Sequence, residues 1–467
     1  MTTTPKSCFG GSARPARERR GALLGARAAP ASAWARVSPR NRTICSASDG
    51  RAALVPRGHT LYPPDNTGRV QGDDVASDRG VHRHYRGLRR TGQRMRSDSA
   101  ESVFRELLAR AGVEVNGSRP FDIQVNDRRF YRRVLAGASL GFGESYMDSW
   151  WDCAALDQLL DRILRARLEQ EVPGNWRIRW HLLRSRLFNL QRPSRAGAVA
   201  RRHYDIGNDF YRAMLGRTMQ YTCAYWQDAA ELDEAQDAKI DLVCRKVGLK
   251  PGMSVLELGC GWGGFARWAA ENYGVKVTAY NVSREQVQLA REACAGLPVE
   301  IVHDDYRNAS GTYDAVVSVG IMEHVGYKNY RTYMELAHRC LAEDGVAFAH
   351  TIGANVSKTT SNAWTTKYIF PNGLLPSIPQ LSTAMEGLFV VEDWHNFGPD
   401  YDRTLMAWHR NFLDAWPTFA ERYGERFRRM WEYYLLSSAA GFRARSTQLW
   451  QIVMTREGRR QPPRVTG

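Results

Sequence analysis

The sequence lacks a long apolar run and any close pairing of cysteines. No stretch reaches about 18 consecutive apolar residues, so we expect no helix that spans a membrane. No two cysteines stand in a C-x-x-C pair, which argues against a zinc site and against a disulfide framework. The eight scattered cysteines are Cys8, Cys45, Cys153, Cys223, Cys244, Cys260, Cys294 and Cys340. This pattern favours a reducing cytoplasm and predicts no metal centre.

Acidic residues are scarce at one end of the chain. Residues 1–100 hold 19 Lys and Arg against 7 Asp and Glu, which gives +12 of the total net charge of +16. The remaining residues carry only +4. A basic balance often indicates a nucleic-acid partner, but charge confined to one tail is more typical of a solvated segment. We therefore expect no nucleic-acid partner.

Residues 1–98 also lack hydrophobic periodicity. They are rich in Arg, Ala, Gly, Ser and Pro, a composition that cannot bury a core and predicts a disordered tail. The segment Arg19–Ala33 looks like a signal peptide, but Arg27 interrupts its apolar part. Two interpretations stay open: an Arg-rich targeting segment, or an over-extended reading frame with Met95 as the true start. The length of the acid-poor stretch favours the second.

The body of the chain begins with a small, mainly helical domain over residues 99–190. Helical spacing of apolar residues starts near Ser102 and can end at Gly112. The further predicted elements are a β-like piece over Phe121–Val125 and helices over Phe130–Leu140 and Ala154–Ala166. Residues 191–198, which include the sequence QRPS, read as a linker.

A larger domain over residues 199–456, followed by a short tail over 457–467, alternates helices with short apolar strands. The predicted strands are Ser254–Leu258, Lys276–Tyr280, Val299–Val302, Ala315–Val319 and Gly345–His350. Such alternation predicts a parallel sheet with helices on both faces. Ligands in these folds bind beyond the carboxyl ends of the strands, and the polar residues discussed below follow those ends.

A glycine-rich turn follows the first of these strands, in the sequence VLELGCGWGGFARWAA. The spacing Glu257-x-Gly259-x-Gly261-x-Gly263 differs from the dinucleotide pattern G-x-G-x-x-G. It resembles the first motif of S-adenosylmethionine-dependent methyltransferases, which implies a cradle for that methyl donor; the alternative is an ordinary tight turn. Asn281 then stands where such folds hold the ribose hydroxyls, and Asp305 with Tyr306 where they hold adenine; the alternative for Asp305 and Tyr306 is an ordinary polar loop.

Longer motifs extend this resemblance over residues 101–456. They are HYDIGNDFY, MQYTCAYW, VLELGCGWGGFA, SVGIMEHVG, AHTIG, KYIFPNG, EDWHNFGPDYDRTLMAW and FRARSTQLWQ. Their order and content closely resemble the cyclopropane-fatty-acyl-phospholipid synthases of the cyclopropane and mycolic acid synthase family. The resemblance implies a class I methyltransferase with a Rossmann-like sheet and helices on both faces, preceded by the small helical domain and the tail.

The resemblance also implies the reaction. A methyl group passes from S-adenosylmethionine to a cis double bond of a phospholipid acyl chain, a carbocation forms, and a bound bicarbonate removes a proton as the ring closes. The implied catalytic residues hold the bicarbonate, and they are the backbone of Cys223, the side chains of Glu323 and His350, the backbone of Ile352, and Tyr401. The implied donor-binding residues are Tyr221, Thr222, Val255, Glu257, Gly259, Cys260, Gly261, Gly263, Asn281, Val282, Gln286, Asp305 and Tyr306.

These residue types suit the chemistry. Aromatic faces such as Tyr225, Trp226 and Tyr401 can stabilise a carbocation without reacting with it. An ionised Glu323 would repel bicarbonate, so we expect a shared proton and coupled titration at that site. The site must also exclude water, which would trap the cation as an alcohol.

One position departs from the family pattern. Family members can carry a cysteine shortly before the F-R-A-R segment, and here Ser438 stands in its place. This argues against an essential thiol nucleophile there.

The substrate implies a peripheral enzyme at the inner face of the cell membrane, and the resemblance implies a homodimer. The segment Ile178–Arg192 mixes apolar residues with arginines, which suits an anionic membrane surface; the alternative is an interdomain helix. Methyl transfer without ring closure, giving a methyl, methylene or hydroxy product, is the alternative function.

Overall fold

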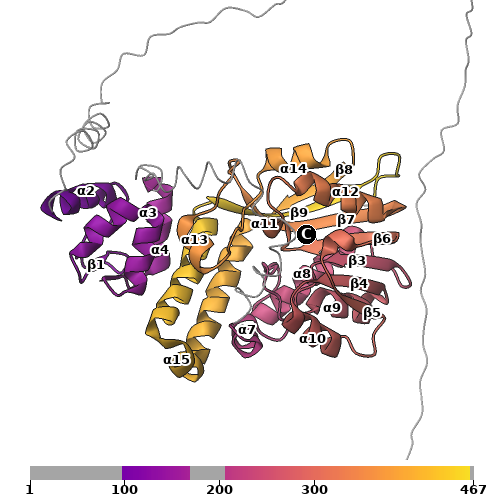
Figure 1. Cartoon of the computed structure of the whole chain (residues 1–467), viewed down its shortest axis with the longest axis horizontal. Helices are drawn as coiled ribbons and strands as arrows, with labels where there is room; N and C mark the ends of the chain where they lie inside the picture. Colours follow the sequence, from indigo (N-terminus) through magenta and orange to yellow (C-terminus); the bar gives the residue numbers. More distant parts are fainter. Residues whose placement is uncertain (1–96, 169–205, 463–467) are drawn as a thin grey trace, which may run out of the picture. The chain divides into compact units, whose positions relative to one another are not determined.

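The structure is a computed structural model that describes residues 97–168 and 206–462 (Figure 1). Three sequence predictions lie wholly or almost wholly outside these residues: the tail over 1–98, the linker over 191–198 and the segment Ile178–Arg192. The domain boundaries predicted from the sequence stay predictions.

The first described range forms a small helical unit. Its elements are α2 (Ser97–Arg110), β1 (Gln124–Val125), α3 (Arg129–Met147), β2 (Trp151–Asp152) and α4 (Leu156–Arg165). The three helices lie where the apolar spacing predicts them, although α3 runs past Leu140. Its backbone leaves the helical region at Ala138, where φ is 48° and ψ is −131°. Beyond this break, an added Cβ on Gly141 would lie 2.3 Å from the carbonyl oxygen of Arg133, so the close approach requires glycine.

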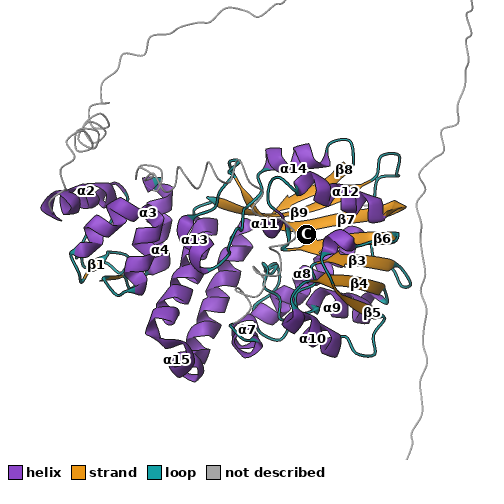
Figure 2. Ribbon diagram, in the orientation of Figure 1, coloured by secondary structure: helices purple, strands orange, loops and turns teal. Residues whose placement is uncertain are grey.

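The second range contains a seven-stranded sheet with the order β5-β4-β3-β6-β7-β9-β8 (Figure 2). The strands are β3 (Ser254–Leu258), β4 (Lys276–Asn281), β5 (Val299–His303), β6 (Tyr313–Val319), β7 (Leu341–Ala354), β8 (Val390–Asn396) and β9 (Thr447–Thr455). Strands β3 to β7 pair in parallel and confirm the five predicted strands. Strand β9 runs antiparallel to β7 and β8, and this reversed pair is an addition to the predicted sheet.

Helices cover both faces of the sheet, as predicted. Residue alternation along β3 sends Val255 to one face and Leu256 to the other, because successive side chains of a strand point in opposite directions. The Val255 face packs against α8 (Leu232–Val247), α9 (Gly264–Tyr273) and α10 (Arg284–Ala293). The Leu256 face packs against α11 (Met322–Val325), α12 (Tyr330–Cys340) and α14 (Ile378–Met385).

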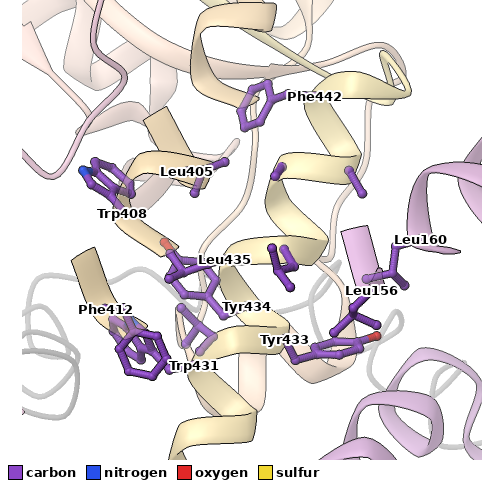
Figure 3. Packing of buried hydrophobic residues seen from close by; sticks show 14 of the residues in the cluster. Leu156, Leu160, Leu405, Trp408, Phe412, Trp431, Tyr433, Tyr434, Leu435 and Phe442 are labelled. Carbon is purple, nitrogen blue, oxygen red and sulfur yellow. The ribbon is translucent and has the colours of Figure 1, made fainter. Parts of the chain in front are cut away.

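A long helical segment, α15 (Gly398–Arg443), connects β8 to β9. Its backbone turns at Gly424, where φ is 74° and ψ is 166°, so that two limbs lie side by side (Figure 1). Tyr401 of the first limb stacks on Phe442 of the second, with ring centroids 4.6 Å apart. Large apolar side chains from both limbs pack with Leu156 and Leu160 of α4 (Figure 3).

The second limb of α15 also binds the helical unit through buried polar groups. The Arg429 guanidinium donates to the carbonyl oxygens of Tyr146 (2.6 Å) and Trp151 (2.9 Å) and lies 2.7 Å from a carboxylate oxygen of Asp152. Its carbon Cζ lies 4.0 Å from the centroid of the Tyr146 ring. The helical unit and α15 therefore share one core.

Two short helices complete the surroundings of the site, α7 (Asn208–Leu215) and α13 (Ala363–Tyr368). Helix α7 packs on α15, and α13 packs on α3. Within residues 97–168 and 206–462, no helix is both long and apolar enough to cross a membrane.

Candidate active site

A cavity of about 1530 Å³ lies at the carboxyl ends of β3, β4, β6 and β7. The predicted site residues that line it are Tyr221, Thr222, Glu257, Gly259, Cys260, Gly261, Asn281, Val282, Gln286, Asp305, Tyr306, Glu323, His350, Ile352 and Tyr401. The side chain of Val255 points instead into the core between the sheet and helices α8, α9 and α10. Gly263 lines a separate, smaller pocket. The fold thus brings most of the predicted donor and acceptor residues to one cavity.

The glycine-rich turn joins β3 to α9. The amides of Gly259 and Cys260 both donate to the carbonyl oxygen of Tyr280, at 3.0 Å each, which fixes the turn to the end of β4. Gly259 has a φ of +86°, and an added Cβ would lie 2.0 Å from Cδ1 of Ile321. Gly261 has a φ of +53°, and its added Cβ would meet no atom within 4 Å. The turn therefore presents open backbone to the cavity at Gly261 and needs glycine at both positions.

Asn281 organises this turn from within the protein. Its Nδ2 donates to the carbonyl oxygen of Gly261 (2.8 Å) and to Oε1 of Gln286 (3.0 Å). Its Oδ1 accepts a hydrogen bond from the amide of Ser283, at 3.0 Å. Because both amide protons of Asn281 are used within the protein, the donor left without a partner is Nε2 of Gln286, a residue that lines the cavity.

Asp305 and Tyr306 lie just after β5, where the sequence places them. Asp305 accepts hydrogen bonds from the amide of Arg307 (3.0 Å) and from its guanidinium (2.9 Å). The ring of Tyr306 packs edge-on against Tyr333, with centroids 5.7 Å apart. These contacts hold a flat aromatic group at the wall of the cavity.

Five buried polar atoms on the cavity-lining residues have no hydrogen-bond partner. They are Oε2 of Glu257, Nε2 of Gln286, Oε2 of Glu323, Nε2 of His350 and Oγ1 of Thr447. Burying a polar group without a partner costs roughly 1–3 kcal/mol. Five such atoms on the residues around one cavity favour a site in which ligand groups complete their hydrogen bonds.

Glu323 is held on α11 by a backbone contact. Its Oε1 accepts a hydrogen bond from the amide of Ile352 on β7, at 2.6 Å. Burial raises the pKa of the Glu323 carboxyl to about 7, because the charged form loses its hydration. Near neutral pH the group therefore exchanges a proton readily, while the shared proton and coupled titration expected from the sequence stay predictions.

His350 lies near the end of the parallel-paired part of β7, beside β9. Its Nδ1 lies 3.4 Å from Nε2 of Gln451, the residue paired with it across the two strands. Burial keeps the pKa of His350 well below its usual range, so the imidazole is neutral. With the Gln451 amide donating to Nδ1, the ring proton resides on Nε2, which is the unpartnered atom.

Tyr401 extends from the first limb of α15. Besides its stacking on Phe442, its ring lies edge-on to Trp408, with centroids 5.9 Å apart. Burial raises the pKa of the Tyr401 phenol well above its usual range, so the group stays protonated and able to donate.

The cysteines near the site are neutral thiols. Cys223 is fully buried, and its Sγ donates to the carbonyl oxygen of Ala224 at 3.1 Å. Its side chain is not part of the cavity wall, and the predicted backbone role stays a prediction. Burial raises the pKa of Cys223 and of Cys260 well above the usual range. Neither thiol has the character of a nucleophile.

Two of the three aromatic residues expected to face the carbocation lie elsewhere. Trp226 donates from Nε1 to Thr404 (2.9 Å), and Arg403 already covers its ring at 4.6 Å. The Tyr225 ring packs edge-on against Phe397. Both side chains are held by contacts with the segment around the start of α15. Aromatic residues that do line the cavity include Tyr221, Phe370, Tyr401, Tyr433, Tyr434 and Phe442.

Two buried polar residues of α8, Gln236 and Lys239, form a clamp on Gln220 and Thr222 that the sequence analysis did not predict. Lys239 donates from Nζ to Oε1 of Gln220 (2.6 Å) and to Oγ1 of Thr222 (3.0 Å). One turn earlier, Nε2 of Gln236 donates to the carbonyl oxygens of the same two residues. Burial lowers the pKa of Lys239 to about 7. The sequence feature that could have revealed this clamp is the presence of two polar residues on an otherwise apolar helix face.

The cavity also extends beyond the predicted residues into the helical unit. Its apolar lining there comes from α2, α3, α4 and the turn after α4: Phe104, Leu107, Leu108, Val134, Leu140, Leu160, Ile163, Leu164 and Leu168. Ser438 of α15 lines the same cavity. The cavity therefore combines a polar end beside the glycine turn with an apolar extension.

Comparisons with known proteins agree with this geometry. A family model described as mycolic acid cyclopropane synthetase matches residues 191–452. The chain is 50% identical over 359 residues to the cyclopropane-fatty-acyl-phospholipid synthase of Escherichia coli, which covers 77% of this chain and 94% of that protein. It is 34% identical over 351 residues to the tuberculostearic acid methyltransferase UfaA1 of Mycobacterium tuberculosis, with 70% of this chain and 81% of that protein covered.

A solved structure shares the fold. The crystal structure of mycolic acid cyclopropane synthase CmaA1 complexed with SAH and CTAB has a TM-score of 0.52 and 31% identity. The match covers 55% of this chain and 97% of that chain. Together with the strand order, this likeness confirms the predicted class I methyltransferase fold.

Proposed function

Because the chain belongs to the mycolic acid cyclopropane synthetase family, we propose that it transfers a methylene group from S-adenosylmethionine to an acyl chain. The acceptor is the cis double bond of an unsaturated chain in a membrane phospholipid, and the product is a cyclopropane ring. The observation that carries the proposal is the single cavity in which a glycine-rich turn, a buried Glu323 and His350, and an apolar extension meet.

The residues around the turn fit S-adenosylmethionine. Glu257 offers the unpartnered Oε2 to a cationic amino group, and Gln286 offers the unpartnered Nε2 to an acceptor such as a ribose oxygen. The open backbone at Gly261 leaves room for close approach of the donor. The ring of Tyr306 supplies a surface for adenine. Two unpartnered polar atoms and the open space at Gly261 are the observations that favour S-adenosylmethionine as the methyl donor.

The buried groups at the other end fit a small anion of the bicarbonate type. His350 presents a neutral ring with its proton on Nε2, and Tyr401 presents a protonated phenol. Glu323 donates from Oε2 when it carries its proton. The amide of Ile352, a predicted anion contact, is already bonded to Glu323 and so fixes that carboxyl instead. When bound, bicarbonate supplies the base that accepts a proton from the new methyl group.

The surroundings suit a cationic reaction path. A ring of aromatic residues, including Tyr221, Phe370 and Tyr434, lines the cavity and can stabilise positive charge through the ring faces. Burial keeps the described cysteines beside the cavity, Cys223 and Cys260, protonated, so neither offers a thiolate that could capture the cation. The apolar wall limits water, which would give an alcohol.

The substrate requires contact with a bilayer, so peripheral membrane association is part of the proposal. The segment Ile178–Arg192 lies outside the described residues, and its predicted membrane contact stays a prediction. The homodimer implied by the family resemblance is likewise a proposal.

Methyl transfer without ring closure is the second candidate, favoured by the relationship to a methyltransferase of tuberculostearic acid. Incubation of the purified protein with a dioleoyl phospholipid in detergent micelles and S-adenosylmethionine separates the two. Ring closure adds one CH₂ per converted chain, and the product resists reduction by diimide. An added CH₂ that diimide still reduces would support the methyltransferase, and an unchanged lipid mass would overturn both.

A further inference from the structure

The apolar residues most exposed to solvent gather beside the cavity. Val356 is 66% exposed and Ile378 is 51% exposed, the highest values among large apolar side chains in the described part of the chain. Val356 lies in the loop between β7 and α13, and Ile378 is the first residue of α14. Isolated exposed apolar residues need no explanation, but neighbouring ones rimmed by polar groups indicate an interaction surface.

Hydrogen bonds place these two residues side by side. The amide of Ala354 donates to the carbonyl oxygen of Pro376 at 2.7 Å, and the hydroxyls of Ser357 and Ser377 lie 2.6 Å apart. Nε2 of Gln380 donates to the carbonyl oxygen of Lys358 at 3.3 Å. The loop that carries Val356 is therefore fastened to the start of α14, which carries Ile378.

The same loop forms the rim of the cavity. Four residues of the segment 358–367 both line the cavity and are exposed: Lys358, Asn362, Ala363 and Lys367. Val356 lies two residues before this segment and is not itself part of the cavity wall. A surface that contacted Val356 and Ile378 would face the cavity opening.

The charge of this region suits an anionic partner. The segment 345–385 contains no Asp or Glu, and its basic side chains are Lys358 and Lys367. Lys367 pairs with Glu144 of α3 at 2.5 Å. The side chain of Lys358 has no hydrogen bond or ion pair with any described residue, so its charge is available to an external group.

We infer that Val356, Ile378 and Lys358 form a docking surface for an anionic phospholipid bilayer, which presents the cavity opening to the lipid. This inference rests on the proposed function, since a bilayer is where that substrate resides. Two apolar side chains would enter the interface between headgroups and acyl chains, while the lysine would pair with a lipid phosphate. Contacts of this size give weak, reversible binding, which suits an enzyme that moves between lipid molecules.

The test compares two double variants in vesicle flotation. The vesicles contain equal parts dioleoylphosphatidylglycerol and dioleoylphosphatidylcholine. Val356→Glu with Ile378→Glu should weaken binding on the order of ten-fold, because carboxylates replace the inserted apolar groups. The control, Val390→Glu with Val391→Glu, adds the same charges at two exposed valines of β8 and should bind within about two-fold of the parent.

Lys358→Gln supplies an independent arm, should the first variant fail to fold. It should weaken binding about five-fold at low salt, the equivalent of one cation near an anionic surface. The difference should vanish on vesicles of phosphatidylcholine alone. Equal binding of Lys358→Gln and the parent to both vesicles would overturn the role of the lysine.

Activity on micelles separates this inference from the proposed function. The Val356 and Ile378 variant should convert dioleoyl phospholipid in detergent micelles within about two-fold of the parent, since neither residue lines the cavity. A parent inactive on micelles would refute the proposed function, while the flotation result would stand alone. Unchanged flotation of this variant, or a changed oligomeric state with unchanged flotation, would overturn the docking surface.

Discussion

Apart from Tyr221 and Thr222, the predicted donor-binding residues at the cavity come from one stretch of chain, residues 257–306, whereas the acceptor end collects residues from distant segments. Glu257, Gly261, Gln286 and Tyr306 follow one another through β3, α9, β4, α10 and β5. At the acceptor end, Glu323 belongs to α11, His350 to β7 and Tyr401 to α15. The first arrangement depends on local turns, and the second depends on the whole topology.

The two ends also differ in what makes them work. The donor end relies on backbone shape, fixed by two amides that donate to Tyr280 and by Asn281. In the proposed function, the acceptor end relies on the protonation of buried side chains, above all Glu323 and His350. Substitutions should therefore separate donor binding from turnover, and pH should act on the acceptor carboxyl.

The largest expected effect separates the two ends at Glu323. Glu323→Gln keeps the oxygen that accepts from Ile352 but cannot exchange a proton, so turnover should fall about 10²–10⁴-fold. Binding of S-adenosylmethionine, measured by calorimetry, should stay within about two-fold. Glu335→Gln, at an exposed position of α12, is the matched control and should leave both values unchanged. If Glu323→Gln also lost binding of S-adenosylmethionine, Glu323 would contribute to donor binding, and the two ends would not be functionally separate.

The next effect concerns stability and pH. The pKa of Glu323 is near 7 in the folded protein against 4.5 for a free side chain. Between about pH 4.5 and 7 the folded state holds a proton that the unfolded state has lost, so the relative stability from this group is complete below pH 4.5 and declines as pH rises through 7. Urea unfolding at pH 5 and pH 8 should show the parent losing about 3 kcal/mol relative to Glu323→Gln over that interval. Parallel pH profiles for the two proteins would mean that Glu323 titrates normally.

A comparable effect is expected at the donor end. Gly259→Ala places a Cβ 2.0 Å from Ile321 at a φ of +86°, so the turn must move. The dissociation constant for S-adenosylmethionine should rise about 100-fold, equivalent to roughly 3 kcal/mol. Gly296→Ala has a similar φ of +81° and no atom within 4 Å, and so controls for backbone strain alone. If both variants bind the donor equally well, the close approach at Gly259 has no role.

The smallest effect tests a link between the ends. Lys239→Met keeps an unbranched side chain but removes two hydrogen bonds to Gln220 and Thr222, both of which line the cavity. Donor affinity and turnover should each fall about ten-fold, since each bond contributes roughly 1 kcal/mol. Lys250→Met, at an exposed position after α8, is the control. If only donor affinity or only turnover changed, the clamp would support one end of the cavity and would not link the two.

Local sequence was sufficient to predict the strand and the glycine-rich turn at the proposed donor end. The turn follows an apolar strand directly, and the spacing of Gly259 and Gly261 matches the positive φ values found there. The strands β3 to β7 follow from short apolar runs between helices. The exception is Asn281, whose amide protons point into the protein. Spacing places a residue at an edge but does not determine which partner its side chain takes.

The remaining features depend on contacts between distant segments. The antiparallel strands β8 and β9 flank a long helical segment, so the short alternation of strands and helices that predicts β3 to β7 does not extend to them. Gln451, which orients His350, becomes its neighbour only through the pairing of β7 with β9. Tyr225 and Trp226 stand beside Cys223 in sequence, yet contacts with α15 and Phe397 hold their rings away from the cavity.

The proposed ring closure is tested most directly with S-adenosylmethionine whose methyl group is fully deuterated. After incubation with a dioleoyl phospholipid, the acyl chains are analysed by mass spectrometry before and after diimide treatment. A base that removes one deuteron from the new methyl group predicts a product with two deuterons that diimide leaves unchanged. A product that retains all three deuterons, or that diimide reduces, would contradict ring closure by this chain.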